Sequence, residues 1–248
     1  MGALYFISDV HLGAQSPAEE AAKEALLLDL LERVSSDGER LYILGDLYDF
    51  WFEYRHVIPS VGQRVLAALQ GLTSRGIEVH YLAGNHDFAI GPYISDTLGC
   101  HIHHEPFEVE WNGARIYLHH GDGLAGKDTG YRIMTKIIRS RAAKWLWRLI
   151  PPGIGFAIAE KVSGTSRHYT AGKDFGSGDR VWAHIEMLAA SGYDYLIMGH
   201  SHVAEERQLD NGSVYINLGS WLGGGAPSAR FEEGHMKLTW PEDRPLTL

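Results

Sequence analysis

The sequence predicts a mixed α/β sandwich, and two patterns lead to this prediction. Up to residue 83, strand-like apolar runs alternate with segments in which apolar residues recur at helical spacing. Such a β-α-β-α-β order is typical of a sheet that is partly parallel and covered by helices. Farther along, Asn-Gly pairs at 112–113 and 211–212 lie next to strand-like runs and indicate β-hairpins. We therefore expect antiparallel strands beside the parallel ones.

Local signals place each element in order. The first helix should begin at Ser16-Pro17, because Ser16 and Glu19 form a capping-box pattern and proline is favoured at the first helical position. Gly38 and Gly76 are typical stop signals for the two helices of this region. The predicted elements are strand 4–7, a helix from 16 to 38, strand 41–44, helix 61–72, strand 79–83, hairpin strands 107–111 and 114–118, helix 181–190, strand 195–198 and a returning strand 214–217.

Residues 123–179 show no β alternation and are predicted to form a helical insert. An apolar stripe at helical spacing, which includes Trp145, runs from Tyr131 to Leu149, and Pro151-Pro152 should end that helix. Between residues 127 and 148, seven basic residues stand against a single acid, Asp128; they are Lys127, Arg132, Lys136, Arg139, Arg141, Lys144 and Arg148. The chain is therefore divided into a core, residues 1–122 and 180–248, and a basic amphipathic cap, residues 123–179.

Composition limits the class of partner. The chain has 248 residues and a formal net charge of -9, whereas general nucleic-acid binding needs a surplus of Lys and Arg. Cys100 is the only cysteine, so no internal disulfide can form, and no Cys-His signature accompanies it. No run reaches about 18 apolar residues, and the first residues lack a signal-peptide pattern. We expect a cytoplasmic protein that binds no nucleic acid, and nothing indicates an obligate protein partner.

Five strand-like runs end in residues that can bind a metal ion. The run 41–44 ends in Gly45-Asp46, and a carboxylate at the buried end of a strand is costly unless a cation or a donor compensates it. Ligand sites of layered α/β folds lie beyond the carboxyl ends of the strands, so the five ends should meet at one crevice. The residues at the other four ends are Asp9 and His11, Asn85 and His86, His120, and His200 and His202.

The spacing and type of these residues suit divalent ions. Asp9 and His11 are two residues apart, as are His200 and His202, so an extended chain places each pair on one side. Carboxylate and imidazole without thiolate suit Mn, Fe, Co or Zn. A two-metal site bridged by Asp46 is the economical arrangement, and two ions can together polarise a phosphoryl group and activate water. Each motif alone is common in a surface turn or a core, but that reading does not explain five in order at strand ends.

The ordered motifs resemble those of the calcineurin-like metallophosphoesterase superfamily. This resemblance implies a four-layer αββα sandwich with a helical cap and two metal ions. It assigns one ion to Asp9, His11, Asp46 and His202, and the other to Asp46, Asn85, His120 and His200. It places Asp46 at the reaction centre and His86 near the leaving-group oxygen, as proton donor or electrostatic stabiliser, with Asp49 orienting His86. The motifs are Asp9-x-His11, Gly45-Asp46-x-x-Asp49, Gly84-Asn85-His86-Asp87, His120-Gly121-Asp122 and Gly199-His200-Ser201-His202.

Within this superfamily the chain is most similar to the UDP-2,3-diacylglucosamine pyrophosphatase family. The shared features are the run from Gly45 to Trp51, the motif Asn85-x-Asp87-Phe88, the segment from His120 to Tyr131 and the placement of the insert. The resemblance implies hydrolysis of the substrate to UMP and 2,3-diacylglucosamine 1-phosphate in lipid A synthesis. Manganese is the implied metal, with Fe, Co or Zn as alternatives. Substrate contacts are implied for Asn85, His86, Asp128, Ser166, Thr170, Lys173 and His200.

The resemblance also gives the insert a role. In this family the insert caps the crevice and binds the acyl chains, which require an apolar cavity. Basic residues on its other face would attract anionic lipid. Trp147, which falls off the apolar stripe beside Arg148, favours membrane contact. The alternative is a solvated basic face over an ordinary helical core. We expect a peripheral protein on the cytoplasmic surface of the inner membrane, acting on a nucleotide-linked lipid.

Two departures from the family pattern bear on the substrate. Many members have Arg at the position of His86 and Asn at that of Thr170. Arg can clamp a diphosphate with a permanent charge, whereas His can donate a proton near neutral pH. A nucleotide, a phosphodiester or a phosphomonoester is therefore an alternative substrate. A scaffold without catalysis is opposed by the presence of every expected ligand, and His101, His103 and His104 are predicted at the surface.

Overall fold

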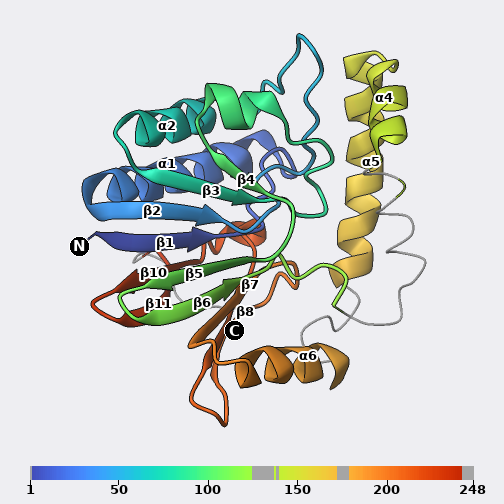
Figure 1. Ribbon diagram of the computed structural model, residues 1–248. Coiled ribbons are helices and arrows are strands. Elements are labelled where there is room, and N and C mark those ends of the chain that lie inside the picture. The colour runs from blue at the N-terminus through green and yellow to red at the C-terminus, as the bar shows by residue number, and fades with distance from the viewer. Residues whose placement is uncertain (1, 125–136, 138–139, 172–178, 242–248) are drawn as a thin grey trace.

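The computed structural model describes residues 2–124, 137, 140–171 and 179–241. Figure 1 shows two β-sheets packed face to face, with α1 (Pro17–Asp37) and α2 (Gln63–Ser74) over the outer face of one sheet. Helix α6 (Asp179–Ala190) lies against the other sheet. This order of helix, sheet, sheet and helix confirms the predicted four-layer α/β sandwich.

Both sheets are mixed. The six-stranded sheet has the order β11-β10-β1-β2-β3-β4, with β1 to β4 parallel and β10 antiparallel to β1. The five-stranded sheet has the order β5-β6-β7-β9-β8, and its hairpins β5–β6 and β8–β9 are those predicted at the two Asn-Gly pairs. The strands are β1 (Ala3–Ile7), β2 (Gly38–Ile43), β3 (Glu78–Leu82), β4 (His101–His103), β5 (Phe107–Trp111), β6 (Ala114–Leu118), β7 (Tyr195–Met198), β8 (Ala204–Gln208), β9 (Val214–Leu218), β10 (Ser228–Glu232) and β11 (His235–Thr239).

Alternation along the strands creates the layers. In β1, Tyr5 and Ile7 pack with α1 and α2, whereas Leu4 and Phe6 face the second sheet. A third cluster joins Ile185 of α6 to the far face of the second sheet. Because β1 is buried on both faces, it appears in the sequence as a continuous apolar run rather than an alternating one.

The first helix begins where the capping box predicts, and the second begins later than predicted. The backbone N–H of Ser16 donates to Glu19 Oε2 at 3.0 Å, and Pro17 is the first residue of α1. Helix α2 begins at Gln63 instead of residue 61, because Gly62 precedes it in the left-handed region, with φ 66°.

The insert is not the single helix predicted for residues 131–149. Ser140 has φ -65° and ψ 152°, so a helix cannot continue through it. Its side chain caps α4 (Arg141–Arg148) by accepting from the N–H of Ala143 at 3.2 Å. Helix α5 (Pro152–Ala171) then begins at a proline, as the ring allows. The predicted stripe residues Tyr131, Met134 and Ile138 lie outside the described residues.

This interruption changes which face of the insert is buried. Trp147 is half-buried and belongs to an aromatic cluster with Phe50, Phe52, Tyr54, Phe88 and Phe156. Trp145 and Leu149, which the stripe placed inside, are 59% and 64% exposed. The choice of Trp147 as a membrane-facing residue was therefore wrong, because the helix phase counted from residue 131 does not continue through Ser140. In Figure 1, α5 stands along the edge where β1, β2 and β3 end.

Candidate metal centre

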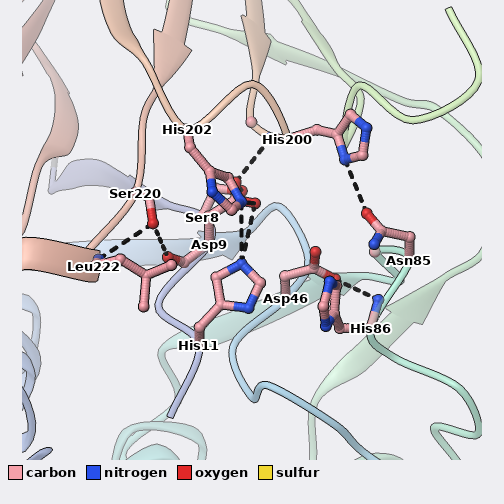
Figure 2. Close-up of polar contacts among 12 residues, drawn as sticks. Ser8, Asp9, His11, Asp46, Asn85, His86, His200, His202, Ser220 and Leu222 are labelled. Atoms are coloured by element: carbon pink, nitrogen blue, oxygen red, sulfur yellow. Dashed lines mark hydrogen bonds and ion pairs between the residues drawn. The ribbon is translucent and has the colours of Figure 1, made fainter. Parts of the chain in front are cut away.

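The candidate site lies where β1, β2, β3, β6 and β7 end. The loops after β1 and β2 run side by side, because Asp9 N donates to Gly45 O at 3.2 Å and His11 N donates to Asp46 O at 3.0 Å. The loop after β7 joins them through His200 N, which donates to Asp9 Oδ2 at 2.8 Å. Figure 2 shows how the side chains from these loops gather in one place. The structure thus brings together the predicted ligands Asp9, His11, Asp46, Asn85, His120, His200 and His202.

Glycine allows two of these loops to approach closely. Gly45 has φ +88°, and a Cβ at this position would lie 2.6 Å from His120 Nδ1. A Cβ at Gly199 would collide with Ser8 Oγ and Asp9 Oδ2. Both glycines directly precede a predicted ligand, so a larger residue at either position would push apart the strand ends that form the site.

Several predicted ligands have a left-handed backbone. This conformation costs an L-residue roughly 1–2 kcal/mol, although Asp and His tolerate it better than most residues. Strain of this kind persists only where the surroundings hold it, and it is concentrated at functional sites. The φ values are 51° for Asp9, 50° for His11, 55° for Asp46, 68° for His200 and 61° for His202.

One half of the site consists of Asp9, His11 and His202. Nε2 of His11 lies 3.2 Å from Nε2 of His202 and 3.7 Å from Asp9 Oδ1. Nε2 of His202 lies 3.3 Å from the same carboxylate oxygen. Asp9 is fully buried, and its Oδ1 makes no hydrogen bond within the part of the chain that the structure describes. A buried carboxylate oxygen between two imidazole nitrogens fits a divalent cation.

The other half consists of Asp46, Asn85, His120 and His200. Nε2 of His120 lies 3.0 Å from Asn85 Oδ1 and 3.3 Å from Asp46 Oδ2. Asn85 Oδ1 also lies 2.8 Å from Nδ1 of His200. Nδ1 of His120 donates to the carbonyl of Leu44 at 2.7 Å, which fixes the ring so that Nε2 faces the carboxylate and the amide.

Asp46 joins the two halves. Its carboxylate is within 4.8 Å of ligand atoms of Asp9 and His120, and it forms a second such group with His11 and His86. It is 1% exposed, so water does little to stabilise its charge. A carboxylate shared by two ligand groups suits a bridge between two ions. Oxygen and imidazole nitrogen suit first-row divalent ions, so the residues fit the two metals that the sequence implies.

The same carboxylates control the protonation of the buried histidines. Burial alone would lower the pKa of His11, but the neighbouring carboxylates of Asp49 and Asp9 raise it to about 9. At His120, too, burial lowers the pKa, but the charge of Asp46 outweighs this effect and raises the pKa well above its ordinary value. In both rings the carboxylates stabilise the imidazolium form. A metal ion binding to these nitrogens must displace the protons.

We therefore expect the metal affinity to rise with pH up to about 9, the raised pKa of His11 in the metal-free protein. Below the raised pKa, the metal-free ring holds a proton that binding must release, so each released proton changes the affinity by about tenfold per pH unit. Calorimetric titration with Mn²⁺ at pH 7 and pH 9.5, in two buffers of different ionisation enthalpy, counts these protons. An affinity independent of pH would contradict the assignment of His11.

His86 lies beside both halves of the site. Its N–H donates to Asp46 Oδ1 at 2.8 Å, its Nδ1 donates to the carbonyl of Asp49 at 2.7 Å, and its ring meets His11 edge-on at 4.7 Å. Burial lowers the pKa of His86 although Asp46 opposes this. Asp49 orients His86 through its backbone carbonyl, while its carboxylate Oδ1 lies closer to His11 Nδ1, at 3.4 Å, than to His86 Nδ1, at 3.9 Å.

The residues predicted to contact the substrate fall into two groups. Asn85, His86 and His200 lie at the metal centre. Asp128 and Lys173 lie outside the described residues, as do the side chains of Ser166 and Thr170, whose backbone belongs to α5. Their contacts with the substrate stay predictions.

Two polar residues that hold the ligands, Lys23 and Ser220, were not singled out in the sequence, and Asp87 was named within a motif without a role of its own. Lys23 had a readable signal, because it lies four residues before Leu27 on the buried face of α1. Ser220 had none, because only the fold brings it to the site. The bonds are from Lys23 Nζ to His11 O at 2.7 Å, from Ser220 Oγ to Asp9 O at 3.1 Å and from Asp46 N to Asp87 Oδ2 at 2.9 Å.

Two other sequence features lie apart from the ligands. Cys100 is 3% exposed, and burial raises the pKa of its thiol to about 12, as expected of an unreactive cysteine. His101 and His104 are exposed, as predicted. His103 is only half-exposed, and its Nε2 lies 3.0 Å from Nδ1 of His80, so the surface prediction was partly wrong for this residue.

Comparison with known proteins adds to this geometry. The chain is 31% identical over 245 residues to a UDP-2,3-diacylglucosamine hydrolase of Aeromonas hydrophila. The alignment covers 97% of this chain and 96% of that protein. It is 29% identical over 236 residues to the protein of that name from Porphyromonas gingivalis, covering 88% and 90%. The corresponding protein of Pseudomonas putida is 30% identical over 200 residues, covering 80% and 81%.

Solved structures are similar at lower identity. Vacuolar Protein Sorting 29 from Cryptosporidium parvum has a TM-score of 0.47 at 13% identity, covering 97% of this chain and 96% of that chain. The phosphoesterase Yfce from E. coli has a TM-score of 0.43 at 20% identity, covering 93% and 88%. Likeness at this level does not bear on activity.

The model of the family described as Calcineurin-like phosphoesterase matches residues 3–204, a span that includes every predicted metal ligand. The chain belongs to this family of metal-dependent phosphoesterases.

Proposed function

We propose that the protein hydrolyses the pyrophosphate bond of UDP-2,3-diacylglucosamine, adding water to give UMP and 2,3-diacylglucosamine 1-phosphate. One observation carries this proposal: a helical insert packs directly on the loops of the two-part metal centre. The rings of Trp147 and Phe50 lie 5.8 Å apart, and those of Trp147 and Phe88 lie 5.4 Å apart. Phe50 follows Asp49, and Phe88 closely follows His86, so the aromatic cluster against which the insert packs lies on the loops that carry these two residues.

The residues of the centre would perform separate tasks. Two divalent ions, manganese in this proposal, would supply Lewis-acid polarisation of the phosphoryl oxygens and lower the pKa of water. Asp9, His11 and His202 would hold one ion; Asn85, His120 and His200 would hold the other, with Asp46 between them. His86 would stabilise the charge on the leaving group.

The cap would provide for the lipid part of the substrate. We propose that residues 123–179 form a separate unit that covers the crevice and accommodates the acyl chains, because an apolar chain needs a cavity lined by apolar side chains. Curated relatives named as hydrolases of this lipid nucleotide align over as much as 97% of the chain, which supports the same role for the insert. Asp128, Ser166, Thr170 and Lys173 would contact the sugar and the phosphates.

A three-substrate assay tests this function. The metal-loaded protein is incubated with UDP-2,3-diacylglucosamine, UDP-glucose or a chromogenic phosphodiester, and the products are measured by mass spectrometry. We expect UMP from the acylated substrate and little from UDP-glucose, because only the former can use the cap. Turnover of the small substrates alone would refute the lipid assignment while leaving the metal centre intact.

The exposed side chains of the insert support membrane contact. On helices α4 and α5, the basic side chains of Arg141, Arg148 and Lys161 are exposed, and they can approach anionic headgroups. No helix in the described ranges is both long enough and apolar enough to span a bilayer. We propose that the exposed apolar and basic side chains of these amphipathic helices hold the protein on the cytoplasmic surface of the inner membrane. Among the described side chains of residues 141–162, the exposed large apolar residues are Trp145 (59%), Leu146 (57%), Leu149 (64%), Ile154 (55%), Ile158 (40%) and Val162 (64%).

Replacing Leu149 with glutamate should weaken binding to vesicles that contain phosphatidylglycerol. Burying a leucine contributes about 1.5–3 kcal/mol, so its loss should lower the affinity about tenfold or more. Sedimentation with vesicles measures the bound fraction. Met187→Glu is the matched control, because Met187 is 56% exposed on α6 and lies outside the insert. Equal loss of binding in both variants would contradict a membrane surface on α4 and α5.

A further inference from the structure

A lysine is buried directly behind the metal centre. Lys23 of α1 is 3% exposed, and its Nζ donates to the carbonyl of His11 at 2.7 Å and to Glu20 Oε1 at 2.8 Å. Removing an ammonium group from water is costly unless partners compensate it, so a lysine here needs a structural reason. The bond to the carbonyl is charge-assisted and lies in a buried environment, where such bonds are strong.

Glu20 extends this contact into a clamp on the loop after β1. Its two carboxylate oxygens accept the backbone N–H groups of Gly13 and Gln15, both at 2.9 Å. Lys23 and Glu20 lie one turn apart on α1 and form an ion pair, so the charge of one offsets that of the other. The clamp therefore fixes the positions of residues 11–15 with little net charge behind the centre.

His11 needs such a clamp. It has φ 50°, and its Nε2 must stay near Asp9 and His202 if the three are to share an ion. Fixing the carbonyl of His11 fixes the peptide plane that follows it, and hence the backbone conformation that aims the ring. The carbonyl of Asp9 has a comparable support, because it accepts from Ser220 Oγ and Trp221 N, both at 3.1 Å. Those donors are neutral, whereas the donor to His11 is an ammonium group.

We propose that Lys23 is a positioning residue, which holds His11 in its strained conformation and so sets the affinity for the ion that Asp9, His11 and His202 would share. This inference rests on the metal centre of the proposed function and not on the substrate. A lysine that only stabilised α1 would affect unfolding without favouring one of the two ions. Supporting residues of metal ligands typically change metal affinity by about 10–100-fold when they are removed.

Lys23→Met tests the proposal, because methionine keeps much of the length and removes the donor. Mn²⁺ binding to the full chain is measured by calorimetry, and retained metal is counted by elemental analysis after desalting. We expect about tenfold or greater weakening for one ion, with the other ion within about twofold of wild type. Activity lost at limiting Mn²⁺ should return at excess Mn²⁺. Both ions bound within twofold of wild-type affinity would overturn the proposal.

Two further variants separate positioning from folding. Arg33→Met is the matched control, because Arg33 is on the same helix but pairs with Asp29 at the surface, and it should bind both ions as the wild type does. If Lys23→Met does not fold, Lys23→Gln retains an N–H donor with a shorter reach and is measured in the same way. It too should weaken one ion, and unchanged binding would overturn the proposal. No substrate enters these titrations, so failure of the lipid assay would not affect them, whereas a wild type that binds no metal would refute the centre itself.

Discussion

Replacing Asp46 with alanine is expected to abolish turnover. Asp46 is the carboxylate that belongs to both halves of the centre, and its Oδ2 lies 3.3 Å from His120 Nε2. Without its carboxylate, the crevice loses a negative charge that attracts cations near His11 and His120. Two bound ions would then repel each other with no anion between them. Loss of about 4 kcal/mol of transition-state stabilisation corresponds to roughly a 10³-fold slower reaction. Steady-state rates and metal analysis of the same preparation measure both effects.

Asp46→Asn separates charge from architecture. An amide oxygen can still accept from the N–H of His86, which donates to Asp46 Oδ1 at 2.8 Å in the wild type. The Asp46→Asn variant should therefore retain the loop structure and lose the metals, and its rate should be as low as that of the alanine variant. Asp29→Ala, a change at the surface of α1, is the control and should be fully active. Retention of two ions and more than a tenth of the wild-type rate by Asp46→Ala would exclude a bridging role.

Sequence reasoning succeeded where a local pattern determines the structure. Gly45-Asp46 and Gly199-His200 directly follow strand-like runs, so the place of these ligands at strand ends could be predicted from the sequence, whereas the close approach at the two glycines is seen only in the structure. The capping box at Ser16 and the hairpin at Asn112-Gly113 are likewise decided by neighbouring residues. The fold and the gathering of the ligands were predictable because parallel strand ends meet at one edge.

Features that depend on a distant contact or on an irregular residue could not be predicted from the sequence. Trp147 was placed on the wrong face because Ser140 is non-helical and caps α4, so the helical phase counted from residue 131 in the sequence does not apply to Trp147. Ser220 reaches Asp9 from 211 residues away, a contact that no local pattern contains. The orientation of His86 by the carbonyl of Asp49 was also hidden, because the sequence specifies side chains and this bond uses the backbone.

His86→Ala should lower kcat by about 10²–10³-fold, within the range of a positioned acid–base group, while both metals stay bound. The reason is geometric: Nδ1 of His86 is occupied by the carbonyl of Asp49, so the ring can act on a substrate only through Nε2. Its pKa is lowered by burial, so the charged form is present only below the ordinary value of 6.5 and is lost as pH rises through the lowered pKa. If the imidazolium stabilises the leaving group, the wild-type rate at saturating metal rises as pH falls through that pKa.

His86→Arg provides the decisive comparison, because guanidinium stays charged throughout this range and can bind a diphosphate in a bidentate manner. Its rate on UDP-2,3-diacylglucosamine should be independent of pH between 5.5 and 8 and should exceed that of His86→Ala about tenfold or more, since one charge-assisted bond contributes about 1.5–3 kcal/mol. Loss of both ions from His86→Ala would instead make His86 a ligand. That outcome would agree with its place in one ligand group with His11 and Asp46, and would require the two-metal assignment to be redrawn around Nε2.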